Sequence, residues 1–95
     1  MEIVKNEAQK QYELPLGDGA VAFVEYVTEG NKIYLTHTEV PKSHQGQGIA
    51  KKLIHGTLGQ IKADGNQLVP LCSFVSSYVN NHEQWHSLLS EGYQM

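Results

Sequence analysis

The sequence contains no arginine, and its seven basic residues are all lysines. Ten acidic residues outnumber them, which gives a formal charge of -3 at pH 7 with the histidines neutral. Binding to a nucleic-acid backbone needs clustered positive charge, and the chain has no basic run. The charge pattern therefore argues against nucleic acid as a partner.

Cysteine and long apolar runs are also scarce. Cys72 is the single cysteine, so no internal disulfide can form, which indicates a reducing compartment or a chemical role. The first ten residues are charged and lack the apolar core of a signal peptide, and no apolar run is long enough to span a bilayer. We therefore expect a cytoplasmic protein without a membrane partner. Its 95 residues allow one small domain, 1–95.

Glycine, by contrast, is frequent and separates short segments with strand character. Gly17-Asp18-Gly19 and Glu29-Gly30-Asn31-Lys32 predict tight turns, because glycine supplies the positive φ that such turns need. Ala20–Val27 is largely apolar on both faces, which predicts a strand in the sheet interior. The expected strands are Ile3–Lys5, Gln11–Leu14, Ala20–Val27, Ile33–Val40 and Gln67–Leu71. Strict alternation in the fourth places Ile33, Leu35, His37 and Glu39 on one side.

The hexapeptide Gln45-Gly46-Gln47-Gly48-Ile49-Ala50 opens an amphipathic segment. Apolar residues at three- and four-residue steps predict a helix from Ile49 to Asp64, ended by Gly65-Asn66. The first amides of such a helix have no intrahelical partner and lie at the positive end of its dipole, so they form an anion site. Taken alone, a glycine pair before a helix equally serves only to reverse the chain.

Two other phosphate-binding motifs do not fit this loop. No Gly-Lys-Ser/Thr follows it, as a P-loop requires, and the G-x-G-x-x-G spacing of a dinucleotide-binding fold is absent.

The remaining pattern predicts an α/β domain. The helix between Ile33–Val40 and Gln67–Leu71 suits a right-handed crossover that joins parallel strands. Gly56 and Gly59 inside the helix predict close packing at those points. Ser73 or Ser76 is expected to cap a short helix that runs to about Val79 and is broken by Asn80-Asn81. A last helix is expected to carry Trp85, Leu88 and Leu89 on one stripe.

Three segments together resemble the GNAT N-acetyltransferase superfamily. Gln45, Gly48 and Ala50 fit its Q/R-x-x-G-x-G/A loop. His37-Thr38-Glu39-Val40 and Pro70-Leu71-Cys72-Ser73-Phe74-Val75 match the H-T-x-V and P-x-C-x-F-V segments of compact single-domain GNAT-like proteins. The resemblance covers most of the chain from Ala20 onward, without the usual pair of helices between the first two strands. It implies the α/β GNAT fold, acetyl-CoA as cosubstrate and transfer of an acetyl group to an amine.

The resemblance also implies where the coenzyme binds. Backbone groups around Glu39 and Val40 would bind pantetheine, and the amides from Gln45 to Ala50 would bind pyrophosphate. A lysine, from among Lys42, Lys51 and Lys52, would meet the remaining phosphate, although a solvated surface explains these lysines better than a specific contact does. The implied coenzyme-binding residues are Glu39, Val40, Gln45, Gly46, Gln47, Gly48, Ile49, Ala50, Lys51 and Asn81.

Cys72 and His37 are the candidate catalytic residues. Cys72 ends a predicted strand just before a helix, whose dipole lowers a thiol pKa, and its thiolate would accept the acetyl group by thioester exchange. The alternative is a small buried hydrophobic residue. His37 would act as general base for Cys72 or for the amine, unless it is a core histidine bonded to backbone. Glu39 is a weaker candidate base, and the other histidines form no metal-ligand pattern, so we predict no metal.

One departure from the superfamily leaves the mechanism open. Its C-terminal pattern N-x-x-A-x-x-x-Y-x-x-x-G-F is matched by Asn81 and Gly92-Tyr93, but Leu88 replaces the tyrosine that protonates the departing thiolate. A cysteine route or solvent acid then becomes more plausible than transfer with that acid. A non-catalytic acyl-CoA-binding module and an interaction domain remain alternatives. The acceptor is also open: a protein lysine or N-terminus, or a small amine.

Overall fold

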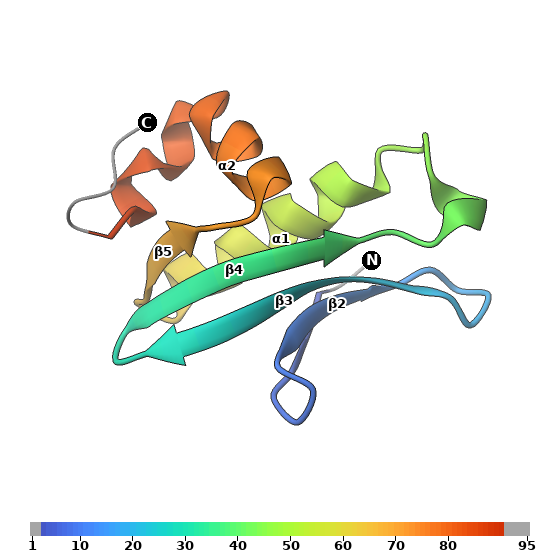
Figure 1. Cartoon of the computed structure of the whole chain (residues 1–95), viewed down its shortest axis with the longest axis horizontal. Coiled ribbons are helices and arrows are strands. Elements are labelled where there is room, and N and C mark those ends of the chain that lie inside the picture. Colours follow the sequence, from blue (N-terminus) through green and yellow to red (C-terminus); the bar gives the residue numbers. More distant parts are fainter. Residues whose placement is uncertain (1–2, 91–95) are drawn as a thin grey trace.

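The computed structural model describes residues 3–90, and within them five strands form one sheet. Both α-helices lie on the same side of this sheet (Figure 1). The strands lie in chain order, with β1 to β4 antiparallel and β5 parallel to β4. This is the predicted α/β fold. The elements are β1 (Val4–Asn6), β2 (Gln11–Pro15), β3 (Val21–Glu29), β4 (Lys32–Glu39), η1 (Lys42–His44), α1 (Ile49–Ala63), β5 (Gln67–Pro70), α2 (Ser73–Asn80) and η2 (Glu83–Leu88).

The predicted turns and the crossover are confirmed. Gly17, Gly19 and Gly30 all have positive φ, at 88°, 91° and 60°, so each turn uses the backbone region that glycine reaches without strain. Gly65, at φ 73°, follows the end of α1 as expected.

The core lies between α1 and one face of the sheet. Leu53, Ile54, Leu58 and Ile61 of α1 are fully buried there. From the sheet they meet Tyr12, Leu14, Ala22, Val24, Tyr26, Ile33 and Leu35. β3 lies between β2 and β4, as predicted, but within residues 3–90 no α-helix covers its second face, where Val27 is 53% exposed. The apolar residues on that face are therefore available for another purpose.

Only one of the two helix glycines marks close packing. A Cβ on Gly56 would overlap the side chain of Ile3, whereas a Cβ on Gly59 would meet nothing within 4 Å. Gln60 Nε2 also donates a hydrogen bond of 2.6 Å to the carbonyl of Ile3. The prediction that both glycines mark close packing is thus confirmed for Gly56 and wrong for Gly59.

A bulge in β4 reverses the predicted side-chain alternation. Tyr26 pairs with Leu35 and Glu25 pairs with His37, so Thr36 is an extra residue in β4. Beyond the bulge Thr38 lies opposite the buried Val24 and takes the helix side. The prediction that His37 and Glu39 share a side with Ile33 and Leu35 is wrong, because the extra residue shifts the register by one. His37 and Glu39 lie instead on the face of the sheet opposite α1 and α2, which we call the helix-free face.

β4 and β5 separate where β4 bulges. Their last pair is Leu35 with Pro70, while β4 continues to Glu39. The amides of Leu71 and Cys72 both donate to the carbonyl of Leu35, at 3.0 and 2.9 Å, and the chain then enters α2. The edge of β4 beyond Leu35 therefore has no strand beside it, which leaves a split between the two strands.

The C-terminal part differs in detail from the prediction. Cys72 is the N-cap residue of α2, so neither Ser73 nor Ser76 caps it, because the bonds to Leu35 hold the chain extended as far as Cys72. The last helix is a 3-10 helix with Trp85 and Leu88 buried, and Leu89 follows its end. Gly92-Tyr93 lie outside the described residues. No helix in the described part of the chain has the length and apolarity needed to cross a membrane.

Candidate active site

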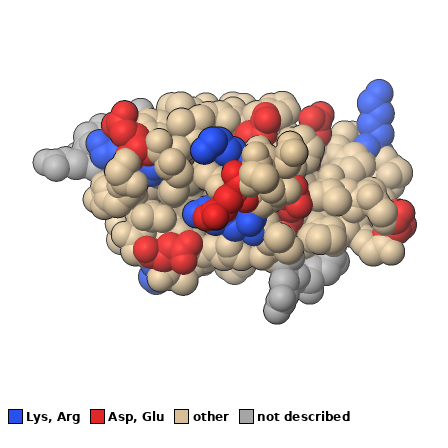
Figure 2. Space-filling view, turned by 90° about the horizontal axis from the view of Figure 1, so that it is seen from below, with Lys and Arg blue, Asp and Glu red and all other residues tan. Residues whose placement is uncertain are grey.

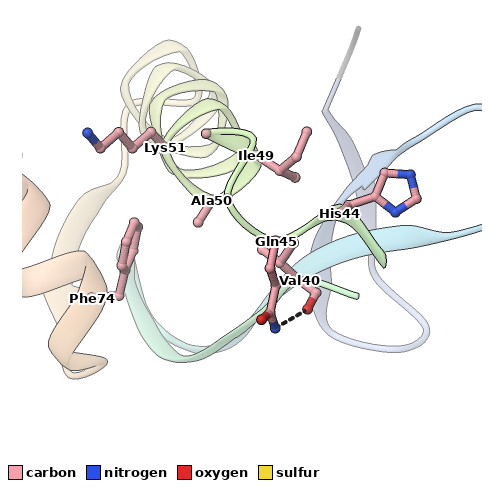
Figure 3. A pocket seen from close by; sticks show the side chains of 9 residues that line it. Val40, His44, Gln45, Ile49, Ala50, Lys51 and Phe74 are labelled. Carbon is pink, nitrogen blue, oxygen red and sulfur yellow. Dashed lines mark hydrogen bonds between the residues drawn. The ribbon is translucent and has the colours of Figure 1, made fainter. Parts of the chain in front are cut away.

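A hollow of about 200 Å³ lies where β4 leads into α1. In Figure 3, Phe74 and Lys51 stand on one side of it, Gln45 and Val40 on the other, and Ala50 between them. The lining residues are Val40, His44, Gln45, Gly46, Gly48, Ile49, Ala50, Lys51 and Phe74. The structure therefore brings most of the predicted loop residues together around one space, with Phe74 from α2 closing it.

The glycine loop presents the front of α1 to this hollow. Gly46 and Gly48 have φ of 83° and 73°, and Gly48 is the N-cap residue of α1. No side chain caps α1, its first turn carries no acidic residue, and its first hydrogen bond runs from Lys52 N–H to the carbonyl of Gly48 at 3.2 Å. Gln45 Nε2 donates to the carbonyl of Val40 at 3.3 Å and ties the loop to the strand end (Figure 3). This leaves the first amides of α1 for an anion.

Several predicted coenzyme-binding residues lie outside the hollow. Gln47 and Glu39 do not line it, and of the three candidate lysines only Lys51 does. The ring of His44 points away from Ala50, and its Nε2 lies 3.1 Å from Asp18 Oδ2 in the β2–β3 turn (Figure 3). Lys51 is therefore the candidate lysine that lines the hollow in front of α1.

Asn81 lines a second hollow of about 220 Å³, which shares Lys51 and Phe74 with the first. The side-chain amide of Asn81 donates through Nδ2 to the carbonyl of Ser77 at 3.0 Å. The rings of Tyr78 and His82, which also line this hollow, stack with their centroids 4.1 Å apart. The two hollows adjoin along α1 and α2.

Cys72 lies at the split between β4 and β5, and its sulfur is 3.3 Å from the Thr38 hydroxyl. Burial alone would raise the pKa of the thiol, but the Thr38 hydroxyl and the amides of Val75, Phe74 and Thr38 outweigh burial. The net result is a Cys72 pKa below that of an ordinary thiol, because these donors favour the thiolate. The structure thus gives the single cysteine the surroundings of a reactive thiol.

The structure brings Thr38, rather than His37, into contact with Cys72. The His37 side chain is 55% exposed on the helix-free face, and its Nε2 lies 3.5 Å from Glu39 Oε2. Thr38 was not among the predicted site residues, although it belongs to the same H-T-x-V segment. Only the bulge at Thr36 shows that the threonine, and not the histidine, faces the cysteine.

The surroundings of Cys72 predict the pH dependence of its alkylation. The rate with iodoacetamide should reach half its maximum at a lower pH than for an unstructured cysteine peptide, because the folded thiol ionises earlier. Thr38→Val should move this midpoint upward by removing a donor to the thiolate. Thr36→Val is the matched control and should leave the midpoint unchanged, since the Thr36 hydroxyl bonds to the carbonyl of Glu25 instead. Equal midpoints for the protein and the peptide would contradict the assignment.

The fold and the glycine loop are those of an acetyltransferase domain, and comparison of the sequence with protein families agrees. Residues 11–88 match the family described as GCN5-related N-acetyl-transferase. The chain belongs to this family. The family in general uses acetyl-CoA as cosubstrate and an amine as acceptor, which supports acetyl transfer as the general function.

Individual relatives show how far the similarity extends. The chain is 36% identical over 66 residues to Protein NATD1 of Gallus gallus, Mus musculus and Homo sapiens, which covers 68% of this chain. The match spans 57 to 58% of those proteins. The solution structure of a GCN5-like protein from Staphylococcus aureus has a TM-score of 0.69 over 98% of this chain and 94% of its own, at 21% identity. That structure supports the fold.

Proposed function

We propose that the protein binds acetyl-CoA and transfers the acetyl group to an amine, with Cys72 as acetyl carrier. The observation that carries this proposal is that the glycine loop follows the end of β4, while Cys72 contacts Thr38 of the same strand beside the split. The free amides of α1 are suited to a diphosphate, and the edge of β4 beyond Leu35, where no strand of residues 3–90 pairs with it, is suited to a pantetheine arm. An acetyl thioester held between them would lie near the sulfur of Cys72.

The coenzyme contacts follow from the two adjoining hollows. Gly46, Gly48 and Ala50 let the diphosphate approach the backbone closely, while Lys51 supplies a mobile positive charge. Asn81 lines the second hollow, and we propose that it contacts the nucleotide end of the coenzyme. Among the described residues no group of three histidine, cysteine or acidic side chains is arranged to hold a metal ion, and the proposal uses none.

The proposed reaction proceeds in two balanced steps. The Cys72 thiolate attacks the thioester carbonyl, the bond from that carbon to the coenzyme sulfur breaks, and coenzyme A leaves as a thiolate. A neutral amine then attacks the S-acetyl carbon, loses a proton and releases the Cys72 thiolate. In this proposal His37, on the helix-free face with its Nε2 3.5 Å from Glu39 Oε2, accepts the proton from an amine that arrives on that side.

A second candidate function rests on Leu88. This residue stands where the superfamily carries a tyrosine acid, and it is 7% exposed, so no hydroxyl occupies that position. A thiolate leaving group of low basicity departs without such an acid, but the same observation suits a domain that binds acyl-CoA without turnover.

Incubation with acetyl-CoA and a panel of amines separates the two functions. The panel contains a lysine peptide with a blocked N-terminus, a peptide with a free N-terminus, and spermidine. The proposed enzyme releases coenzyme A and acetylates at least one amine, whereas the binding module is stabilised by the coenzyme without forming product. Absence of both product and thermal stabilisation would contradict both functions.

A further inference from the structure

A third hollow, of about 330 Å³, lies on the helix-free face of the sheet. Val27 and Leu71 are 53% and 54% exposed, which is high for large apolar side chains. Exposed apolar side chains gathered at one hollow are typical of a binding surface rather than of a solvated one. The hollow is lined by Val27, Thr28, Glu29, Tyr34, Thr36 and Leu71, and we name it the acceptor groove.

The acceptor groove lies next to the candidate nucleophile. Leu71 directly precedes Cys72, and the amides of both residues bond to the same carbonyl, that of Leu35. Thr36 is the bulged residue at which β4 separates from β5. The acceptor groove therefore opens beside the split, on the helix-free face of the sheet. The hollow in front of α1 lies beyond the end of β4, farther along the split. A side chain entering the split from the groove approaches Cys72 from the side opposite α2.

Carboxylates flank the apolar part of this groove. Glu25, Val27 and Glu29 share the helix-free face of β3, and the Cα atoms of the two glutamates are about 13 Å apart at the usual rise of a strand. Lys32 lies opposite Glu29, yet among the described residues neither Glu25 nor Glu29 forms an ion pair. Figure 2, which views the molecule from below relative to Figure 1, shows acidic side chains and lysines interspersed on that side of the molecule. Glu29 lines the groove, whereas Glu25 lies two residues before Val27 on the same face of β3.

We infer that the acceptor is a lysine within an extended basic peptide that lies along β3; this inference rests on the proposed acetyl transfer. The methylene groups of the acceptor lysine pack on Val27 and Leu71, and its amine reaches into the split. In an extended peptide every second side chain faces the same way, so residues two positions before and after the lysine face the sheet near Glu25 and Glu29. Positively charged peptide side chains at those two positions would complement the negative charges of Glu25 and Glu29.

The spacing favours a peptide over a polyamine. Two glutamates whose Cα atoms are about 13 Å apart, with an apolar stretch between them, fit three same-face side chains of an extended chain. The central side chain is the acceptor, so both flanking charges are satisfied while its amine is free to enter the split. Spermidine has three amines, so when both terminal amines pair with the two carboxylates only its internal secondary amine is left for transfer.

The test compares two blocked pentapeptides, Arg-Ala-Lys-Ala-Arg and Gln-Ala-Lys-Ala-Gln, as acceptors. Arginine is not an acceptor amine, so the central lysine is the one acetylation site in both. The arginine peptide should have a kcat/KM roughly tenfold higher, in line with two partly exposed ion pairs, and 0.5 M salt should remove most of the difference. The double variant Glu25→Gln with Glu29→Gln should lose the preference, so that the two peptides have similar kcat/KM values.

A matched control and a binding measurement complete the test. The double variant Glu7→Gln with Glu83→Gln makes the same change in net charge elsewhere and should keep the preference. In ¹⁵N-labelled protein the arginine peptide should shift the amide signals of Val27, Tyr34 and Leu71, whether or not transfer occurs. Equal kcat/KM values, loss of the preference in the control, a stronger effect of spermidine on these signals, or shifts elsewhere would each overturn the inference. Failure of the proposed acetyl transfer would show separately, as peptide shifts at the groove without product.

Discussion

Replacing Gly48 with glutamate is expected to weaken acetyl-CoA binding about a hundredfold, or about 2.8 kcal/mol. The new carboxylate would stand at the front of α1, where the account places a diphosphate, and would both repel it and compete for the free amides. A Cβ on Gly48 meets nothing within 4 Å, so a steric clash within the protein does not explain the loss. Calorimetric titration with acetyl-CoA measures the effect.

Two further variants separate charge from backbone strain. Gly17→Glu introduces the same side chain at φ 88° in the β2–β3 turn, with open space around it, and should bind acetyl-CoA as the unmodified protein does. Gly48→Gln keeps the size and the strain without the charge and should lose roughly tenfold or less. If Gly48→Glu binds within twofold of the unmodified protein, the diphosphate does not lie at this helix end.

Replacing Cys72 with alanine is expected to lower kcat for amine acetylation by at least about a hundredfold, because it removes the covalent carrier. The affinity for acetyl-CoA should stay within about twofold, since the phosphate and pantetheine contacts come from the loop and from β4. The unmodified protein mixed with acetyl-CoA should gain one acetyl group on Cys72, visible by intact mass. Alanine should abolish this adduct.

Thr38→Val distinguishes a nucleophilic role from a packing role for Cys72. This variant keeps the thiol and a side chain of similar shape, but it removes the hydroxyl 3.3 Å from the sulfur. Its rate should therefore fall most at low pH and recover as pH rises above the ordinary thiol pKa. Undiminished acetylation in Cys72→Ala, together with no adduct on the unmodified protein, would remove the cysteine from the mechanism and leave direct transfer.

The glycine positions explain why so much of the fold was predictable. Gly17, Gly19, Gly30, Gly48 and Gly65 all have positive φ, and each ends a segment that the sequence pattern had delimited. The spacing of apolar residues from Ile49 to Ile61 likewise predicted which face of α1 is buried, because this pattern depends on the local sequence alone.

The errors lie where pairing between distant segments decides the local geometry. The bulge at Thr36 arises from the register between β3 and β4, and the residue type at that position does not predict it. It exchanged the sides of His37 and Thr38, so the residue that contacts Cys72 was not predicted. The N-cap of α2 shifted to Cys72 for a similar reason, since the carbonyl of Leu35, far away in sequence, holds that segment extended.

The central claim is that the first amides of α1 hold the diphosphate of the coenzyme while its thioester lies beside Cys72. A titration of ¹⁵N-labelled protein with coenzyme A, followed amide by amide, tests it most directly. The account predicts that the largest shifts fall on Gly46, Gly48 and Ala50, with further shifts on Thr38 and Cys72. Saturable binding whose shifts spare both groups, or no shifts at millimolar coenzyme with folded protein, would contradict it.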